Sequence, residues 1–188
     1  KELRRIMKTR QARPRSIHRV MQYAVFTGGK RFRPVLTLAV CEACGGKMRD
    51  ALPAACAIEM IHTYSLIHDD LPALDNDDLR RGQPTCHKKF GEAAAILAGD
   101  GLLTLAFEVL SEVKPAERAA ELVRRVSTAS GTHGMIGGQV ADIEGEHRDL
   151  TADNVRYIHE RKTAALIAAA CRLGALAVGV GGADLSPV

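Results

Sequence analysis

The chain has 188 residues, of which 46% are hydrophobic and 26% charged, with no Trp and only four Phe and three Tyr. This length suits a single domain, residues 1–188, that can bury a real core. The net charge of +4 is small and no basic stripe with interleaved aromatic residues is present, which argues against a nucleic-acid partner. Abundant Ala and Leu favour helices over strands, and the chain is predicted to be all-α.

Seven helices are predicted from apolar periodicity and from start and stop residues. Their approximate ranges are residues 15–26, 34–45, 53–71, 92–113, 116–130, 132–146 and 152–178. Gly28-Gly29 ends the first helix, Pro53 opens the third, and Thr151 can cap the last. No strand-like alternation persists, and the short connections predict that neighbouring helices are antiparallel.

The cysteines and the apolar stretches bear on the cellular compartment. An odd number of five cysteines, lying in apolar helical runs with no signal peptide before them, predicts free thiols in a reducing cytoplasm. Cys41 and Cys44 lack the second ligand pair of a zinc site. Residues 164–180 are apolar, but Arg172 and two glycines interrupt them, so a buried core helix is expected rather than a membrane segment. The basic residues among the first 19 are expected to form a solvated helix face or arm.

An acidic block follows the third predicted helix. Five aspartates lie within residues 69–78, and Asp69 and Asp70 fall in the last helical turn, where the helix dipole already places partial negative charge. Crowded carboxylates repel one another unless a cation joins them. The following Arg80-Arg81 pair adds guanidinium groups. Carboxylates, a divalent metal and guanidinium groups together predict a receptor for a metal-bound diphosphate.

A calcium loop is the rival interpretation of the same block. Asp75-Asn76-Asp77 begins like an EF-hand, but Leu79 replaces a ligand, Arg80 the required Gly, and Cys86 the bidentate Glu. Magnesium fits better, because it binds through few carboxylates while phosphate oxygens fill its shell.

Three other patterns support an anion site. The turn Gly28-Gly29-Lys30-Arg31-Phe32-Arg33 places three cations just before a helix, whose first N–H groups also favour anions. His62 lies two helical turns before Asp69 and shares its face. Gln139 and Asp142 share a later helix face, and Lys162-Thr163 lies in the middle of the last helix. The Gln139–Asp142 pair and the Lys162-Thr163 pair are weak signals when taken alone.

These motifs, in this order and over almost the whole chain, resemble the short-chain trans-isoprenyl diphosphate synthases, most of all the bacterial farnesyl diphosphate synthase type. The resemblance implies an all-α antiparallel helical bundle around a central cavity, usually a homodimer. It also implies the head-to-tail condensation of isopentenyl diphosphate with a magnesium-bound allylic diphosphate, dimethylallyl or geranyl diphosphate, to give farnesyl diphosphate.

Residue roles follow from the same resemblance. It implies that Asp69 and Asp75 bind Mg²⁺ with Asp70 assisting, and that Arg80 with Lys162 contacts the allylic diphosphate. It implies that the isopentenyl diphosphate pocket is formed by Lys30, Arg33, His62 and Arg81. It also implies that Gln139 and Thr163 are polar groups near the allylic cation, with Asp142 in support. Tyr64, with Ser65 beside it, lies five residues before Asp69, where an aromatic side chain resembles the C15-producing members.

The chain departs from the family in one respect. No second aspartate-rich motif follows Asp142, so the chain is expected to be the N-terminal two-thirds of the family domain and, by itself, inactive or nearly so. A geranylgeranyl diphosphate synthase and a non-catalytic partner subunit are the alternatives, although such subunits usually lose the aspartate block or the Arg pair. A terpene cyclase or squalene-type synthase would lack the isopentenyl diphosphate pocket.

Overall fold

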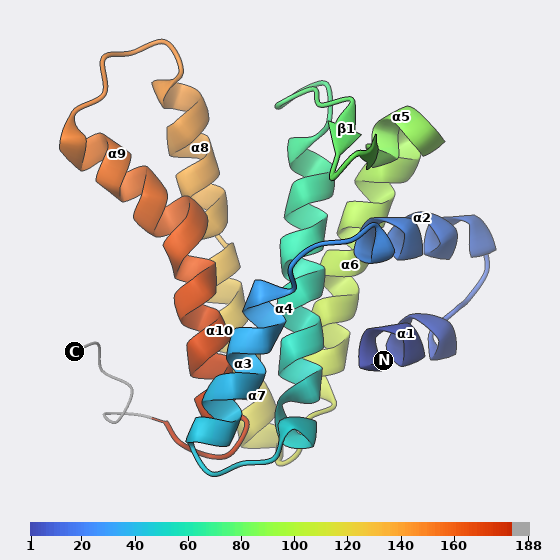
Figure 1. The fold of residues 1–188 in the computed structure, drawn as a ribbon, viewed down its shortest axis with the longest axis vertical. Coiled ribbons are helices and arrows are strands. Elements are labelled where there is room, and N and C mark those ends of the chain that lie inside the picture. Colours follow the sequence, from blue (N-terminus) through green and yellow to red (C-terminus); the bar gives the residue numbers. More distant parts are fainter. Residues whose placement is uncertain (182–188) are drawn as a thin grey trace. The chain divides into compact units, whose positions relative to one another are not determined.

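The computed structural model describes residues 1–181, which are helical apart from one two-stranded hairpin and the connecting turns (Figure 1). The helices are α1 Glu2–Thr9, α2 Arg15–Phe26, α3 Phe32–Ala43, α4 Met48–Asp69, α5 Cys86–Phe90, α6 Glu92–Ser111, α7 Ala116–Ser130, α8 Met135–Gly145, α9 Ala152–Ile158, the π-helix η1 His159–Ala164, and α10 Ala165–Leu176. The prediction of an all-α chain is confirmed. Residues 182–188, expected to form a loop, lie outside the described residues.

The predicted helices at Arg15–Phe26 and Ala116–Ser130 have the bounds that the sequence indicated. The third was predicted to open at Pro53, and this is wrong, because α4 begins at Met48. The Lys47 N–H donates to the Asp50 carboxylate at 3.1 Å, so an acidic side chain caps the helix ahead of the proline. Pro53 then lies one turn inside the helix and forgoes its own N–H bond.

A short hairpin and α5 were not predicted. Strands β1 Leu79–Arg80 and β2 Gln83–Pro84 pair antiparallel, with Arg80 opposite Gln83. Arg81 and Gly82 both have positive φ, 55° and 74°, as a two-residue type I′ hairpin turn requires. Two-residue strands are too short to show alternation, so the sequence pattern could not reveal them.

The last predicted helix is divided into three segments. Thr151 caps it as expected, because its hydroxyl accepts the Asn154 N–H while the Asn154 side chain accepts the Thr151 N–H. The backbone then widens into the π-helix η1 at His159–Ala164 before α10 continues. A π-helix within an α-helix is rare and frequently marks a functional site. This one carries Lys162 and Thr163.

The chain divides into two compact units. Unit 1 comprises Lys1–Arg31 and Glu59–Val109, and unit 2 comprises Phe32–Ile58 and Leu110–Val188. In unit 1, α2 lies against α5, where the Tyr23 and Phe90 rings meet edge to face at 5.2 Å. Helix α1 buries Ile6 and Met7 and leaves Arg4 and Arg5 exposed, as an amphipathic basic helix would.

In unit 2, α10 lies between α3 and α7. Its predicted core character is confirmed, since Leu166, Leu173 and their small neighbours are buried. Gly174 allows close approach to α3, because a Cβ there would overlap the Thr37 carbonyl oxygen. The buried Thr37 hydroxyl donates to the Ala170 carbonyl at 2.9 Å, so a polar bond fastens the two helices together.

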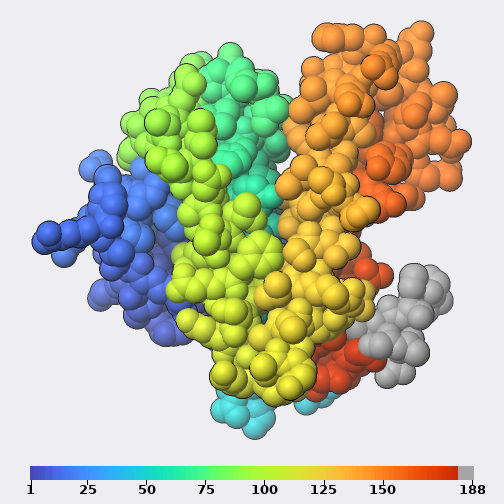
Figure 2. Space-filling model, turned by 180° about the vertical axis from the view of Figure 1, so that it is seen from behind, coloured from blue at the N-terminus to red at the C-terminus, as the bar shows by residue number. Residues whose placement is uncertain are grey.

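One helix in the described part of the chain, α6, is long and apolar enough to cross a membrane by length and composition, with a mean hydropathy of 1.7. Core helices of globular proteins often meet the same criterion, and this one contacts other helices of unit 1 through Gly99 and Gly101. Figure 2 shows the light-green atoms of α6 along the visible face. Ile96 and Leu97 of this helix are exposed.

All five cysteines are free thiols, as predicted. Burial raises the pKa of Cys86 to about 11, whereas Cys44 is exposed. Only about 0.1% of the Cys86 thiol is ionised at pH 8, and the thiolate is the reactive form. We therefore expect brief N-ethylmaleimide treatment to modify Cys44 before Cys86, as read by peptide mass spectrometry. Equal rates at the two cysteines would contradict this burial.

Candidate functional site

The acidic block folds back on itself at the end of α4. The Asp75 N–H donates to the Asp69 carbonyl at 2.9 Å, and the Asn76 N–H donates to the Leu71 carbonyl at 3.1 Å. Asn76 adopts a positive φ of 51°, which this tight return requires and which Asn tolerates better than most residues. The turn therefore brings the Asp69 and Asp75 backbones side by side, with Asp75 exposed.

Asp70 points elsewhere. It is 3% exposed, and Arg80 Nε donates to its Oδ1 at 2.6 Å. Burial raises the pKa of the Asp70 carboxyl, although the Arg80 guanidinium opposes that shift. Arg80 also reaches the Asp77 carboxylate at 3.4 Å. In this structure Asp70 anchors the first arginine of the pair, and its assistance to metal binding stays a prediction.

Mg²⁺ is the metal that the sequence predicts for the acidic block. Within residues 1–181, no three His, Cys, Asp or Glu side chains are gathered as a closed metal cage. Mg²⁺ does not need one, because it commonly binds through one or two carboxylates and takes its other ligands from water and phosphate. Asp69 and Asp75, whose backbones are joined by a hydrogen bond, are the two carboxylates predicted to hold it.

A second group of cations lies at the turn after α2, where the sequence predicts an anion site. Arg81 Nη1 donates to the Gly28 carbonyl at 2.5 Å, so the second arginine of the hairpin is fixed to this turn. Gly28 and Gly29 have φ of 95° and 112°, values that side-chain-bearing residues rarely adopt. A Cβ on Gly29 would also overlap the Arg81 guanidinium. Lys30 is exposed beside them, so the turn presents two cations together.

Arg31 does not belong to that cationic surface, contrary to the sequence interpretation. Its guanidinium donates to the Glu59 carboxylate on α4 and to the Val25 carbonyl at the end of α2. Glu59 is only 2% exposed, so the carboxylate of this ion pair is buried, while Arg31 is half-buried. Arg31 therefore holds the turn in place from inside. An i+28 partner gives no local sequence signal, which is why the pattern could not identify it.

Helix α4 carries three further predicted site residues, His62, Tyr64 and Ser65, all in unit 1. His62 is half-buried, two turns before Asp69 on the same helix face. The Ser65 hydroxyl donates to the His62 carbonyl at 2.9 Å, so Ser65 is satisfied within its own helix. Tyr64 is 5% exposed, and its buried hydroxyl has no hydrogen-bond partner.

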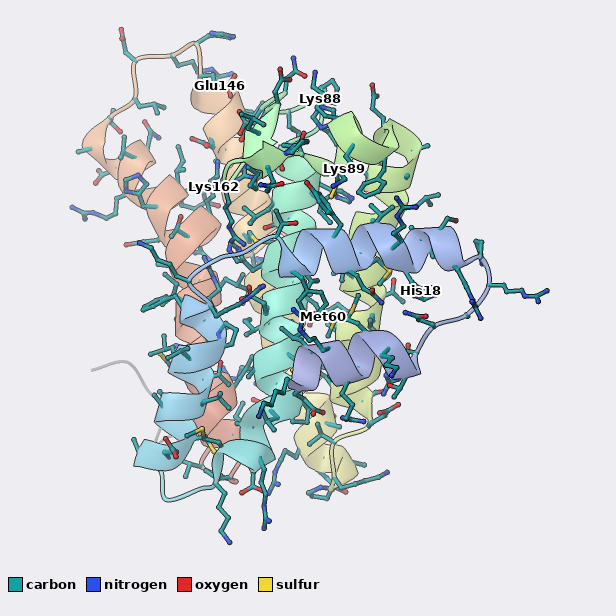
Figure 3. The ribbon with its side chains drawn as sticks, turned by 45° about the vertical axis from the view of Figure 1, so that its right-hand side comes forward. His18, Met60, Lys88, Lys89, Glu146 and Lys162 are labelled. Carbon is teal, nitrogen blue, oxygen red and sulfur yellow. The ribbon has the colours of Figure 1, made fainter. Side chains whose placement is uncertain are left out.

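Unit 2 brings another part of the predicted set together. Lys162, which is labelled in Figure 3, lies on η1. Its Nζ is 2.5 Å from the Asp142 carboxylate on α8. Gly138 makes this approach possible, since a Cβ there would overlap the Lys162 backbone N. Gln139 is half-buried next to Gly138, and Thr163 is exposed beside Lys162. Arg33, in the first turn of α3, also belongs to unit 2.

Thr85 is a structural residue of the site that the sequence did not reveal. Its hydroxyl donates to the Asp77 carbonyl at 2.8 Å, and its N–H donates to the Asp78 carbonyl at 3.0 Å. Both bonds fasten the end of the acidic block to the base of the hairpin that carries Arg80 and Arg81. A Thr directly before a helix is a weak signal that predicts a cap, and here no such cap bond forms.

A polyprenyl synthetase family model matches residues 14–186. Farnesyl diphosphate synthase from Bacillus subtilis (strain 168) is 53% identical over 167 residues, which cover 87% of this chain and 56% of that protein. The chloroplastic heterodimeric geranylgeranyl pyrophosphate synthase large subunit 1 from Arabidopsis thaliana is also 53% identical, over 91% of this chain and 48% of that protein. The chain thus spans about half the length of the curated relatives that it matches.

Solved structures show the same similarity. An apo FPP/GFPP synthase from Zymomonas mobilis matches 98% of this chain and 69% of that one, with a TM-score of 0.90 and 40% identity. A geranyltransferase from Legionella pneumophila matches 97% of this chain and 66% of that one, with a TM-score of 0.91 and 39% identity.

Proposed function

This chain belongs to the polyprenyl synthetase family, and from that membership we propose that it forms the substrate-binding part of a prenyltransferase. The enzyme joins isopentenyl diphosphate to dimethylallyl or geranyl diphosphate, head to tail, and makes farnesyl diphosphate. The observation that carries this proposal is in unit 1. There, Arg80 of the hairpin donates to Asp70 of the acidic block, and Arg81 donates to the Gly28 carbonyl of the Gly28–Gly29 turn. Two neighbouring arginines thus serve two anion-binding places, as two diphosphate substrates require.

In the reaction, the allylic C–O bond breaks and leaves an allylic cation and diphosphate. The double bond of isopentenyl diphosphate then attacks the cation, a carbon–carbon bond forms, and a proton is lost to the departing diphosphate. Asp69 and Asp75 are proposed to hold Mg²⁺, which when bound neutralises charge on the leaving group. Arg80, already oriented by Asp70, adds a fixed cation at the same group.

The remaining residues have proposed roles in binding. Lys30, Arg33, His62 and Arg81 hold isopentenyl diphosphate, Lys162 supports the allylic diphosphate with Asp142 as its counter-charge, and Gln139 and Thr163 provide polar groups near the cation. The Lys162–Asp142 ion pair supports part of this assignment, because the carboxylate fixes where the ammonium group lies. A homodimer in the cytoplasm remains part of the proposal.

A geranylgeranyl diphosphate synthase is the second candidate function. One relative with 53% identity is named as such a synthase, and its identity equals that of the Bacillus subtilis farnesyl diphosphate synthase. The side chain that favours the C15 product is Tyr64, which is buried and aromatic.

Tyr64→Ala is expected to lengthen the product. Tyr64 is 5% exposed, so removing its ring opens space on α4 one turn before Asp69. We expect the share of C20 and longer products to rise about tenfold, which needs only ~1.4 kcal/mol of change in relative barriers. Chromatography of dephosphorylated products measures it. An unchanged product profile would show that Tyr64 does not limit chain length.

The proposed function is tested with the complete polypeptide that carries this sequence, incubated with Mg²⁺, isopentenyl diphosphate and geranyl diphosphate. Farnesyl diphosphate formation that depends on all three supports it. Turnover of geranyl diphosphate without isopentenyl diphosphate would indicate a terpene cyclase. No turnover unless a second protein is added would indicate a non-catalytic partner subunit.

A further inference from the structure

His68 connects Tyr64, the residue proposed to limit product length, to helix α6. Its ring meets the Tyr64 ring edge to face, with centroids 5.8 Å apart and planes at 77°. On its other side, His68 Nε2 donates to the Ile96 carbonyl of α6 at 3.1 Å. The Asp100 carboxylate lies 3.8 Å from the same nitrogen. All four residues belong to unit 1, and His68 immediately precedes Asp69.

Gly99 is what allows His68 to reach α6. A Cβ on Gly99 would overlap His68 Nε2 and the two ring carbons beside it. Gly99 has an ordinary helical backbone, so its glycine is not needed for conformation. In the middle of a helix a glycine costs about 1 kcal/mol relative to Ala. We infer that Gly99 is needed because it leaves space for the His68 ring.

Gly101, on the same helix, is a natural comparison. A Cβ there would meet Met21 Sδ at 3.1 Å, and a flexible thioether can move aside. His68 has no equivalent freedom, because its ring is held between the Tyr64 ring and the Ile96 carbonyl. The two glycines differ in what they face and share their helix and backbone conformation.

We propose that His68, seated against Gly99 of α6, is a positioning residue that fixes the Tyr64 ring and through it limits product length. The Tyr64 hydroxyl is buried without a partner, so no hydrogen bond of its own holds this ring. The His68 edge contact and the hydrogen bond behind it supply that restraint. The effect on product length rests on the proposed function, whereas the effect on the Tyr64 ring does not.

The first test is made on the chain itself by NMR with ring-labelled tyrosine, since the sequence has only three Tyr. Gly99→Ala and His68→Ala are expected to shift the Tyr64 ring resonances and leave those of Tyr157 unchanged. Gly101→Ala should leave Tyr64 as in the wild type. If Tyr64 resonances in folded Gly99→Ala match the wild type, the proposed restraint is wrong.

The second test is the product distribution of the complete polypeptide. His68→Ala vacates space next to Tyr64, and Gly99→Ala displaces the His68 ring, so both should raise the C20 share about tenfold. His68→Gln retains an N–H donor for the Ile96 carbonyl and should give an intermediate distribution. Gly101→Ala should keep the wild-type distribution.

The outcomes separate the two proposals. A wild-type protein that does not elongate geranyl diphosphate would overturn the proposed function, and the NMR comparison would still decide the restraint on Tyr64. A wild-type C15 product that stays unchanged in Gly99→Ala and His68→Ala would overturn control of length by His68. Equal shifts in Gly99→Ala and Gly101→Ala would also overturn it, because the effect would then come from helix α6 in general.

Discussion

Replacing Asp69 with Asn is expected to lower prenyltransferase turnover roughly a thousandfold, because a metal at a leaving diphosphate supplies several kcal/mol of charge stabilisation. The fold should be unaffected. Asp69 ends α4, where a negative side chain opposes the helix dipole, so neutralising it removes a local repulsion. Product formation at saturating Mg²⁺ measures the activity, and circular dichroism measures the helix content.

Asp78→Asn is the matched control within the same acidic block. Asp78 lies 2.7 Å from Lys88 Nζ at the exposed end of the block, away from the Asp69–Asp75 hydrogen bond. Its replacement should change turnover less than about threefold, since exposed ion pairs contribute little. Comparable losses in Asp69→Asn and Asp78→Asn would show that the overall charge of the block matters rather than a specific ligand.

The second large effect is expected on stability. Arg31→Met leaves the Glu59 carboxylate, 2% exposed, without its cation, and breaking a buried ion pair on one side typically costs about 3–5 kcal/mol. The variant also loses the hydrogen bond to the Val25 carbonyl that ties the end of α2 to the Gly28–Lys30 turn. Urea unfolding followed by circular dichroism measures the loss in unfolding free energy.

Two further variants identify the cause. Arg31→Met combined with Glu59→Leu should recover much of the loss, because an apolar pair replaces an uncompensated buried charge. Arg124→Met removes an exposed arginine paired with Glu121 and should leave the unfolding curve unchanged. A double variant as unstable as Arg31→Met would show that the Val25 hydrogen bond, rather than the buried charge, carries the effect.

The helices could be predicted where local chemistry decides their ends. Gly28 ends α2 with a positive φ, and Thr151 caps α9, and both are short-range effects that the sequence displays. The start of α4 could not be predicted from Pro53, since the Asp50 side chain caps the helix earlier. The π-helix at His159–Ala164 escaped prediction as well. It lies where Gly138 allows α8 to approach closely, and a contact between residues so distant in sequence leaves no local pattern.

The candidate site divides in the same way. The acidic block and the Arg pair are recognisable from the sequence because their charges are contiguous. The sequence does not show that Lys30 is exposed while Arg31 pairs with Glu59, since only the fold brings Glu59 to Arg31. Likewise, the sequence does not show that Asp70 is buried beside Arg80 while Asp75 is exposed. Apolar periodicity identifies which residues share a helix face. It does not identify the ion-pair partners of charged residues, because those partners are distant in sequence.

The central claim is that the acidic block with Arg80 holds a diphosphate through Mg²⁺. Calorimetric titration of the chain with inorganic pyrophosphate tests it most directly, with Mg²⁺ present, with EDTA, and in the Asp69→Asn and Asp78→Asn variants. Pyrophosphate binding is expected to need Mg²⁺, to be lost in Asp69→Asn and to persist in Asp78→Asn. Binding of equal strength in EDTA, or in Asp69→Asn, would contradict it.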